Sequence, residues 1–259
     1  MPQALVTGAG KRLGRAIALD LAASGYDVAV HYGTSYAEAE EVAGLIRDMG
    51  RHAVTLRADL AVEGEVSTLV ARAAKGLGAP LDCLVNNASA FEYDNVHSVT
   101  RESWDRHMEC NLRAPFVLSQ TFAAQCPAAE ADPQGEPEAR SLIVNMIDQR
   151  VRKLTPEFTS YTLSRAALWV LTQTMAQGLA PDVRVNAIGP GPTLKGGRQD
   201  EGQFQRQRES TVLGRGSNPE DITRALRFLL SAPGVTGQMI CTDGGQHLGW
   251  RTPDVMDVE

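Results

Sequence analysis

Short apolar runs alternate along the chain with longer segments in which apolar residues recur at helical spacing. The short runs have the length of buried strands, and the longer segments predict amphipathic helices. The predicted strands are residues 3–7, 27–32, 52–57, 81–85, 141–146, 183–188 and 238–242. The predicted helices are residues 12–24, 36–50, 63–76, 157–180 and 219–230, with two more within 100–126 separated by a break near Arg113–Pro115.

This alternation of strands and helices predicts the fold class. Strands joined by helices need right-handed crossover connections, which produce a parallel sheet covered by helices on both faces. We therefore expect an α/β fold in which one doubly wound domain spans residues 1–259 and holds about seven parallel strands. Ligands of such sheets bind outside the carboxyl ends of the strands, so the loops there should carry the functional residues.

Two segments interrupt the alternation. Residues 127–140 are rich in proline and acidic residues and hold no large apolar side chain, which predicts an exposed loop. Residues 193–218 are polar and glycine-rich, with a helical pattern near 200–212. We expect this second segment to form a lid over the substrate.

Composition excludes several classes of function. The chain of 259 residues carries a net charge of −6, which argues against nonspecific binding to nucleic acid or to anionic membranes. No apolar run is long enough to span a membrane and no signal peptide precedes the first strand, so a cytoplasmic location is expected. The cysteines and histidines are dispersed, which favours free thiols and predicts no metal site.

The first predicted strand leads into a turn bracketed by Gly8 and Gly14 and followed at once by a helix. This combination binds the pyrophosphate of a dinucleotide, whose charge is met by backbone N–H groups at the helix N-terminus. Lys11 and Arg12 add two positive charges, which is more than a pyrophosphate needs. The turn therefore predicts NADP(H), which carries a further phosphate, although a surface turn that is basic by chance would have the same pattern.

The loop after the second strand supports this interpretation. An NAD enzyme usually carries an acidic residue here that binds the 2′-hydroxyl of the ribose. The sequence His31-Tyr32-Gly33-Thr34-Ser35 contains no acidic residue. Positive charge from the first turn and hydroxyl groups from this loop favour a 2′-phosphate. His31 by itself is equally consistent with a strand-end residue that has no role in binding.

Two further loops and a helix carry candidate catalytic groups. Phe91 follows the fourth strand, where its ring is either a ligand contact or ordinary core, and Asp148 follows the fifth strand. Tyr161 and Arg165 lie one turn apart on the next helix, where the cation is placed to lower the pKa of the tyrosine. Such a tyrosine is a possible general acid, and a Tyr–Arg pair on a solvated helix face is the alternative.

Taken in order, these residues resemble the short-chain dehydrogenase/reductases over nearly the whole chain. The matching motifs are Thr7–Gly14, Asp59-Leu60, Asn86-Asn87-Ala88, Asn111, Tyr161 and Pro190-Gly191. Within that family the chain is most similar to pteridine reductases and to bacterial dihydromonapterin or dihydrofolate reductases. This closer likeness rests on Arg12 in place of a glycine, on HYGTS, on NNASAF and on NMID where most members have serine.

The resemblance implies a role for each site residue. The cofactor would be contacted by Gly8, Lys11, Arg12, Leu13, Gly14, His31, Tyr32, Ser35, Asp59, Leu60, Asn87, Ala88, Ser89, Pro190, Gly191 and Thr193. Among these, Arg12 and the loop 31–35 would hold the 2′-phosphate. Phe91 would stack a pterin ring against the nicotinamide, and Asn111 would hold a water in a proton relay. Asp148, with Tyr161, would supply protons to a reduced C=N bond.

The replacement of serine by Asp148 has a chemical rationale. A serine hydroxyl suits a carbonyl oxygen, whereas a carboxyl group grips an amidine-like N–C–NH₂ edge with paired hydrogen bonds. A carboxyl group whose pKa is raised is also a proton donor. The alternative for Asp148 is an ion pair with Arg150 or Arg152.

Arg165 departs from the family, which has lysine at this position. The lysine binds the hydroxyls of the nicotinamide ribose and sustains a low tyrosine pKa. Arginine keeps the positive charge, but it is larger, planar and effectively never deprotonated. We therefore expect a slower or more substrate-restricted enzyme.

Three functions are consistent with these residues. The leading hypothesis is an NADPH-dependent reductase of a dihydropterin or of dihydrofolate. The second is a carbonyl reductase acting on 3-oxoacyl or sugar-derived substrates, against which Asp148 weighs. The third is a weakly catalytic NADP(H)-binding protein that acts as a sensor or partner, and Arg165 is the feature in its favour.

The long helix predicted at 157–180 has apolar residues on more than one face. One face must pack on the sheet, and the resemblance implies that another forms a four-helix contact in a homotetramer. Complete burial within the monomer is the alternative. The tail 250–259 is too short to fold alone, and we expect it to dock on a neighbour or to be disordered.

Overall fold

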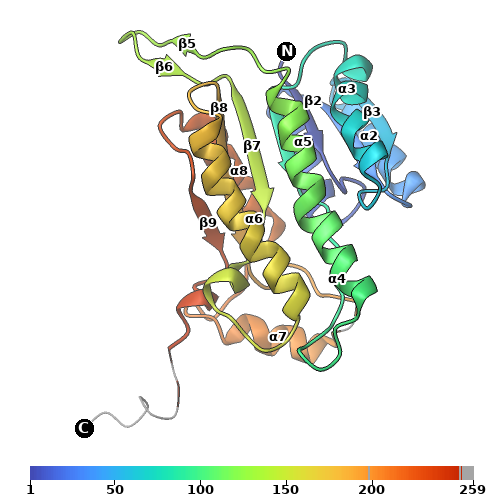
Figure 1. The fold of residues 1–259 in the computed structure, drawn as a ribbon, viewed down its shortest axis with the longest axis vertical. Helices are drawn as coiled ribbons and strands as arrows, with labels where there is room; N and C mark the ends of the chain where they lie inside the picture. Colours follow the sequence, from blue (N-terminus) through green and yellow to red (C-terminus); the bar gives the residue numbers. More distant parts are fainter. Residues whose placement is uncertain (198, 251, 253–259) are drawn as a thin grey trace.

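The computed structural model describes residues 1–197, 199–250 and 252, and within them seven strands form one parallel sheet (Figure 1). The strand order is β3-β2-β1-β4-β7-β8-β9, and every neighbouring pair is parallel. The strands are β1 (Gln3–Val6), β2 (Asp27–Tyr32), β3 (Ala53–Arg57), β4 (Cys83–Asn86), β7 (Ser141–Met146), β8 (Val183–Pro190) and β9 (Met239–Thr242). The predicted doubly wound α/β fold is confirmed.

The helices match the predicted segments to within a few residues at their ends. They are α1 (Arg12–Ala23), α2 (Tyr36–Asp48), α3 (Glu63–Leu77), α4 (Arg101–Met108), α5 (Ala114–Ala123), α6 (Thr159–Gly178), α7 (Glu201–Glu209) and α8 (Pro219–Ser231). Two short 3-10 helices, η2 (Gln149–Arg152) and η3 (Gln246–Leu248), follow β7 and β9.

The break expected near Arg113–Pro115 is a π-helical segment, η1 (Glu109–Arg113), that links α4 directly to α5. The proline causes no break, because it lies in the first turn of α5, where its missing N–H costs nothing. The π-helical turn sits beside the carboxyl end of β4 and projects Asn111 into the interior. Such turns are frequent at functional sites.

Two apolar cores hold the layers together. Helices α1, α2 and α8 pack on one face of the sheet, and α3, α5 and the C-terminal half of α6 pack on the other. Figure 1 looks onto the face covered by α5 and α6. The central strands β1, β4 and β7 are buried over their full length because both of their faces are covered.

The segment 127–140, expected to be an exposed loop, contains a two-stranded hairpin of β5 (Glu130–Ala131) and β6 (Pro137–Glu138). Its residues are exposed or half-buried, as expected, and an ion pair between Arg140 and Glu130 spans it at 2.6 Å. The hairpin has no alternating apolar pattern, so nothing in the sequence indicated strands. Figure 1 places it at the opposite end of the molecule from α7.

The strand order reverses between β1 and β4, which opens a crevice at the carboxyl end of the sheet. The expected lid, residues 193–218 apart from 198, lies at this end and includes α7 (Figure 1). In the part of the chain that the structure describes, no helix is both long and apolar enough to cross a membrane. Most of the tail 250–259 lies outside the described residues.

Candidate active site

The glycine turn after β1 has the geometry of a phosphate site. Gly8 has a φ of +62°, and a Cβ on Gly14 would overlap the Gly8 carbonyl oxygen, so both positions require glycine. Asn87 braces the turn from the β4 loop by donating from Nδ2 to the carbonyl oxygen of Thr7 at 2.8 Å. Helix α1 begins without a side-chain cap, which leaves its first N–H groups available to an anion.

A cavity of about 340 Å³ adjoins this turn. It brings together several of the residues predicted to contact the cofactor: Gly8, His31, Asp59, Leu60, Ala88 and Ser89. Gly33, Thr34 and Arg57 line the same cavity. Arg57 was missed from the sequence, although the parallel register that pairs it with Tyr32 places it beside the β2 loop. Several glycine, alanine and serine residues of the lining leave space beside the turn, and Arg57 and Asp59 add charged groups.

His31 is almost fully buried and stabilises the glycine turn by hydrogen bonds from its ring. Its Nδ1 accepts a hydrogen bond from the Gly8 N–H at 3.0 Å, and Nε2 donates to the carbonyl oxygen of Ala58 at 3.1 Å. Burial lowers the pKa of His31 to about 4, which keeps the ring neutral. Both ring nitrogens of His31 are thus used in shaping the turn, and a contact between His31 and the cofactor stays a prediction.

Lys11 and Arg12 make different contacts, which the sequence did not predict. Lys11 Nζ forms an exposed ion pair with Glu38 at 2.7 Å. Arg12, with a φ of +53°, donates from its guanidinium to the carbonyl oxygens of Leu194 and Lys195 at 3.0 and 2.8 Å. Lys11 therefore lies on the side of the turn near α2, whereas Arg12 joins the turn to the lid. Binding of a 2′-phosphate by either residue stays a prediction.

Tyr161 and Asp148 meet at the carboxyl end of β7. The Tyr161 hydroxyl donates to Asp148 Oδ2 at 3.1 Å, and the Arg150 N–H donates to Asp148 Oδ1 at 2.8 Å. Loss of hydration raises the pKa of both Asp148 and Tyr161. The Arg150 guanidinium donates to Thr155 instead, so Asp148 is held by a backbone group rather than by the side-chain ion pair considered as an alternative.

Arg165 lies on the same face of α6 as Tyr161 and is 2% exposed. Its Nη1 donates to the carbonyl oxygen of Met146 at 3.0 Å, and its Cζ lies 5.3 Å from the centre of the Tyr161 ring. Its charge opposes the effect of burial on the tyrosine pKa without cancelling it. Arg165 Nε is buried with no hydrogen-bond partner, which is consistent with a polar ligand beside it.

Phe91 forms part of an aromatic wall beside this pair. Its ring stacks on Phe158 at a centroid distance of 4.6 Å and meets the edge of Tyr161 at 4.7 Å. Phe91 is 47% exposed, so the wall is open to a ligand. Phe158 was not singled out from the sequence. Its placement depends on a left-handed backbone with a φ of +60° just before α6, which no local pattern signals.

Asn111 anchors the loop that carries Phe91. Its Oδ1 accepts from the Ala90 N–H at 2.8 Å, and its Nδ2 donates to the Ala90 carbonyl oxygen at 2.9 Å and to Ser164 Oγ at 3.1 Å. Both hydrogens of the Asn111 amide are therefore used by the protein. A water relay through this residue stays a prediction.

The remaining predicted cofactor contacts lie around the crevice. Leu13 packs against the core under α1, and Tyr32 and Ser35 lie at the end of β2 and the start of α2. At the end of β8, a Cβ on Gly191 would approach Asp243 Cα to 2.7 Å, so this turn also requires glycine. Thr193, two residues on, donates to the Gly191 carbonyl oxygen at 3.1 Å.

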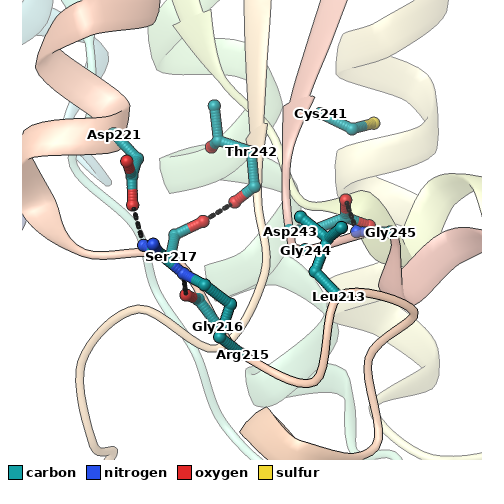
Figure 2. Close-up of a pocket in the computed structure, with 10 residues that line it drawn as sticks. All are labelled: Leu213, Arg215, Gly216, Ser217, Asp221, Cys241, Thr242, Asp243, Gly244 and Gly245. Atoms are coloured by element: carbon teal, nitrogen blue, oxygen red, sulfur yellow. Dashed lines mark hydrogen bonds and ion pairs between the residues drawn. The ribbon is translucent and has the colours of Figure 1, made fainter.

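A second cavity, of about 320 Å³, lies between the end of the lid and the end of β9 (Figure 2). Its polar groups bind one another: Arg215 pairs with Asp221 at 2.9 Å, and Ser217 donates to the Thr242 carbonyl oxygen. The residues predicted to contact cofactor or substrate do not line it. Among the described residues, no group of His, Cys, Asp and Glu side chains is placed to hold a metal ion.

Comparison with known proteins places this geometry in a family. A family model described as enoyl-(acyl carrier protein) reductase matches residues 8–247. A short-chain type dehydrogenase/reductase of Picea abies is 30% identical over 257 residues, which cover 94% of this chain and 91% of the relative. The chain belongs to the short-chain dehydrogenase/reductase family. It is therefore an oxidoreductase, as its motifs predicted.

Other members of the family are similar to this chain over nearly its whole length. FolM alternative dihydrofolate reductase 1 from Brucella suis, crystallised with NADP, is 44% identical with a TM-score of 0.90, covering 98% of both chains. A 3-oxoacyl-[acyl-carrier-protein] reductase FabG of Staphylococcus aureus is 31% identical, covering 95% of this chain and 98% of the relative. The predicted similarity to a dihydrofolate reductase is confirmed, and the Brucella structure holds the predicted cofactor. The two relatives act on different substrates, so family membership does not fix the substrate.

Proposed function

We propose that the chain is an NADPH-dependent reductase of the C=N bond of a dihydropterin or dihydrofolate. The observation that carries this proposal is the hydrogen bond between Tyr161 and Asp148 at the open end of the sheet. The carboxyl group occupies the place where most members have the serine that suits a carbonyl oxygen. The similarity to the Brucella dihydrofolate reductase supports the same choice.

The groups around Asp148 suit a flat, nitrogen-rich ring. One carboxyl oxygen is bound by the Arg150 N–H and the other by the Tyr161 hydroxyl, and each retains a lone pair for a substrate N–H. Phe91 and Phe158 provide an aromatic surface beside them. A planar heterocycle can therefore stack against the aromatic wall, and its amidine edge can donate to the two carboxyl oxygens of Asp148.

Reduction adds a hydride to the carbon and a proton to the nitrogen of the C=N bond. When bound, NADPH supplies the hydride. The turn from Gly8 to Gly14 and the N-terminus of α1 bind its pyrophosphate, and the cavity beside Asp59 takes its adenosine. Burial raises the pKa of both Tyr161 and Asp148, so each keeps its proton to a higher pH than in water, and this pair delivers one proton to the nitrogen.

The test is a comparison of substrates with the purified protein. NADPH oxidation is followed by absorbance with 7,8-dihydropterins, with dihydrofolate, and with 3-oxoacyl thioesters and simple ketones. We expect turnover of the pterins or folate and none of the ketones. Turnover of ketones alone overturns the proposal, and tight NADPH binding without any turnover favours the weakly catalytic protein.

A carbonyl reductase is the second candidate, and the similarity to the Staphylococcus aureus enzyme favours it. Asp148→Ser decides between the two, because it restores the group that most members use for a carbonyl oxygen. In a pterin reductase this change should abolish turnover of the pterin. In a carbonyl reductase it should leave turnover of the ketone unchanged or raise it.

We also propose that the protein acts as a homotetramer in the cytoplasm. Leu163 and Val170 lie two turns apart on α6 and are 45% and 58% exposed, and Trp104 on the neighbouring α4 is 37% exposed. Leu163 and Val170 therefore expose apolar surface on one face of α6, and Trp104 exposes more on the helix packed against it. Light scattering of the purified protein should give four times the chain mass. Val170→Glu should reduce this mass, whereas Val212→Glu, at an exposed lid residue, should not.

A further inference from the structure

Three fully buried polar side chains lie directly behind the aromatic wall. Asp94 follows β4, His107 is on α4 and Ser160 is on α6, and none is more than 1% exposed. His107 Nδ1 lies 2.6 Å from Ser160 Oγ, and Ser160 Oγ donates in turn to Asp94 Oδ2. The network therefore joins three elements that are far apart in the sequence and that all border the site.

The direction of each hydrogen bond in this network is fixed. The Glu92 N–H lies 3.1 Å from His107 Nε2 and can only donate, so Nε2 must accept. The ring proton is therefore on Nδ1 and is donated to Ser160 Oγ, which leaves the serine hydroxyl to donate to Asp94. Burial lowers the pKa of His107, which agrees with the neutral ring that this chain of bonds requires.

Asp94 also caps the N-terminus of α6. Its carbonyl oxygen accepts from the Phe158 N–H at 2.7 Å, and its carboxylate accepts from the Ser160 N–H at 3.1 Å. One residue thus satisfies N–H groups on either side of the point where α6 begins. These bonds tie the β4 loop to the left-handed residue Phe158 and to the first turn of the helix.

The network ends next to Phe91 and Tyr161, the two side chains proposed to contact the substrate. Phe91 precedes Glu92, and Tyr161 follows Ser160, and their rings meet at 4.7 Å with an interplanar angle of 73°. We propose that Asp94, His107 and Ser160 are positioning residues that fix the Tyr161 hydroxyl relative to the Phe91 ring. This inference rests on the proposed reductase function. The network reaches the substrate only through these two neighbours.

The test compares Ser160→Ala with Ser119→Ala. Ser119 on α5 is also fully buried, donates to the Pro115 carbonyl oxygen at 2.7 Å and accepts from Asn86 Nδ2 at 3.4 Å, so its hydrogen bonds are not part of the network behind the wall. We expect Ser160→Ala to lower kcat by about tenfold to a hundredfold, because small misplacements of a reacting group have effects of this size. The Kd of NADPH should stay within about twofold. Ser119→Ala should lower the Tm similarly and leave kcat unchanged.

Asp94→Asn and the titration of Tyr161 test the positioning role in two further ways. Asp94→Asn keeps the shape but puts an N–H group against the serine hydroxyl, and we expect the same loss of kcat. The Tyr161 titration is read as the absorbance difference from Tyr161→Phe. Asp148 and Arg165 act on this hydroxyl, and the His107 ring packs edge-on against the Tyr161 ring. Its pKa should fall towards the ordinary value when Ser160→Ala admits water, and should not change with Ser119→Ala.

The outcomes separate the two proposals. A lower Tm in Ser160→Ala with kcat and the Tyr161 titration unchanged overturns the positioning role. An equal loss of kcat in Ser119→Ala also overturns it. A wild-type enzyme without pterin or folate turnover overturns the proposed function instead. The positioning role is then decided by the tyrosine titration, which needs no substrate.

Discussion

The Tyr161 hydroxyl donates a hydrogen bond to Asp148 Oδ2 across 3.1 Å, and burial raises the pKa of both groups. A raised pKa means that each group keeps its proton to a higher pH than it would in water. The pair therefore keeps its protons to a higher pH than free side chains would, at the carboxyl end of the sheet. Arg165 opposes this effect without reversing it.

The first prediction concerns pH. If Asp148 supplies or relays the proton, the rate depends on its protonated form, whose fraction falls as pH rises through the raised pKa. We expect kcat to decrease with a one-proton slope as pH rises through the raised pKa of Asp148, after correction for the acid decay of NADPH. Tyr161→Phe should keep this slope at a much lower rate, and Asp148→Asn should lose it. A wild-type rate that rises with pH where Asp148→Asn shows no slope would contradict the assignment.

The second prediction concerns Arg165. Its guanidinium donates to the Met146 carbonyl oxygen, lies 5.3 Å from the centre of the Tyr161 ring, and opposes the rise in the Tyr161 pKa by its charge and a hydrogen bond. Lysine carries its charge as a compact ammonium group on a flexible stem, which concentrates the charge at the phenol oxygen instead of spreading it over a planar group. We expect Arg165→Lys to raise kcat by up to about tenfold, the effect of one pKa unit. Arg165→Met, which removes the charge, should lower kcat. A rate that is unchanged or lower in Arg165→Lys refutes the idea that arginine limits turnover.

The strands and the helices were accessible from the sequence because each depends on short-range spacing, whereas the pairing of Tyr161 with Asp148 was implied by the resemblance to the family. Apolar periodicity locates the elements, and parallel topology brings the carboxyl ends of the strands to one edge. The hairpin β5–β6 was missed because its few residues carry no alternating pattern. The π-helical turn was read as a break because a proline follows it closely.

The tertiary contacts of polar side chains were not accessible in this way. The burial of His31 under the turn depends on how β2 and the segment after β3 pack. Phe158 has a left-handed backbone and donates from its N–H to the carbonyl oxygen of Asp94, which is distant in the sequence. Sequence spacing gives no information on contacts of this kind.

The third prediction concerns the contact between Arg12 and the lid. Arg12→Ala removes the bonds to Leu194 and Lys195 but keeps the unfavourable positive φ, whereas Arg12→Gly removes the bonds and relieves the backbone. Both variants should be cleaved faster by trypsin after Lys195 and should show a KM for substrate raised by roughly threefold to fivefold. Arg12→Gly should have a Tm above that of Arg12→Ala. Equal cleavage rates in wild type and both variants would show that the contact does not hold the lid.

The last prediction concerns the charge beside the cofactor turn. Lys11 is paired with Glu38 at 2.7 Å, and this contact holds the pKa of Glu38 below its usual value, so the carboxylate is charged at neutral pH. A 2′-phosphate bound by Lys11 would be repelled by that carboxylate. Glu38→Gln should therefore tighten the binding of NADPH by about twofold to fivefold, the range of an exposed ion pair, and leave that of NADH unchanged. This increase in affinity should become smaller at high salt, because Lys11 and Glu38 are both exposed.

Glu41 provides the matched control for this prediction, since it is exposed on the same helix and pairs with Arg15 at 3.0 Å. Glu41→Gln removes the same charge one turn further from the helix start and should leave the affinity for NADPH within experimental error. Equal gains for NADPH and NADH in Glu38→Gln would assign the effect to the pyrophosphate, which both cofactors share. Lys11 would then bind the pyrophosphate. The 2′-phosphate would be bound by the hydroxyl groups after β2 and by Arg57, which lines the cavity beside the glycine turn.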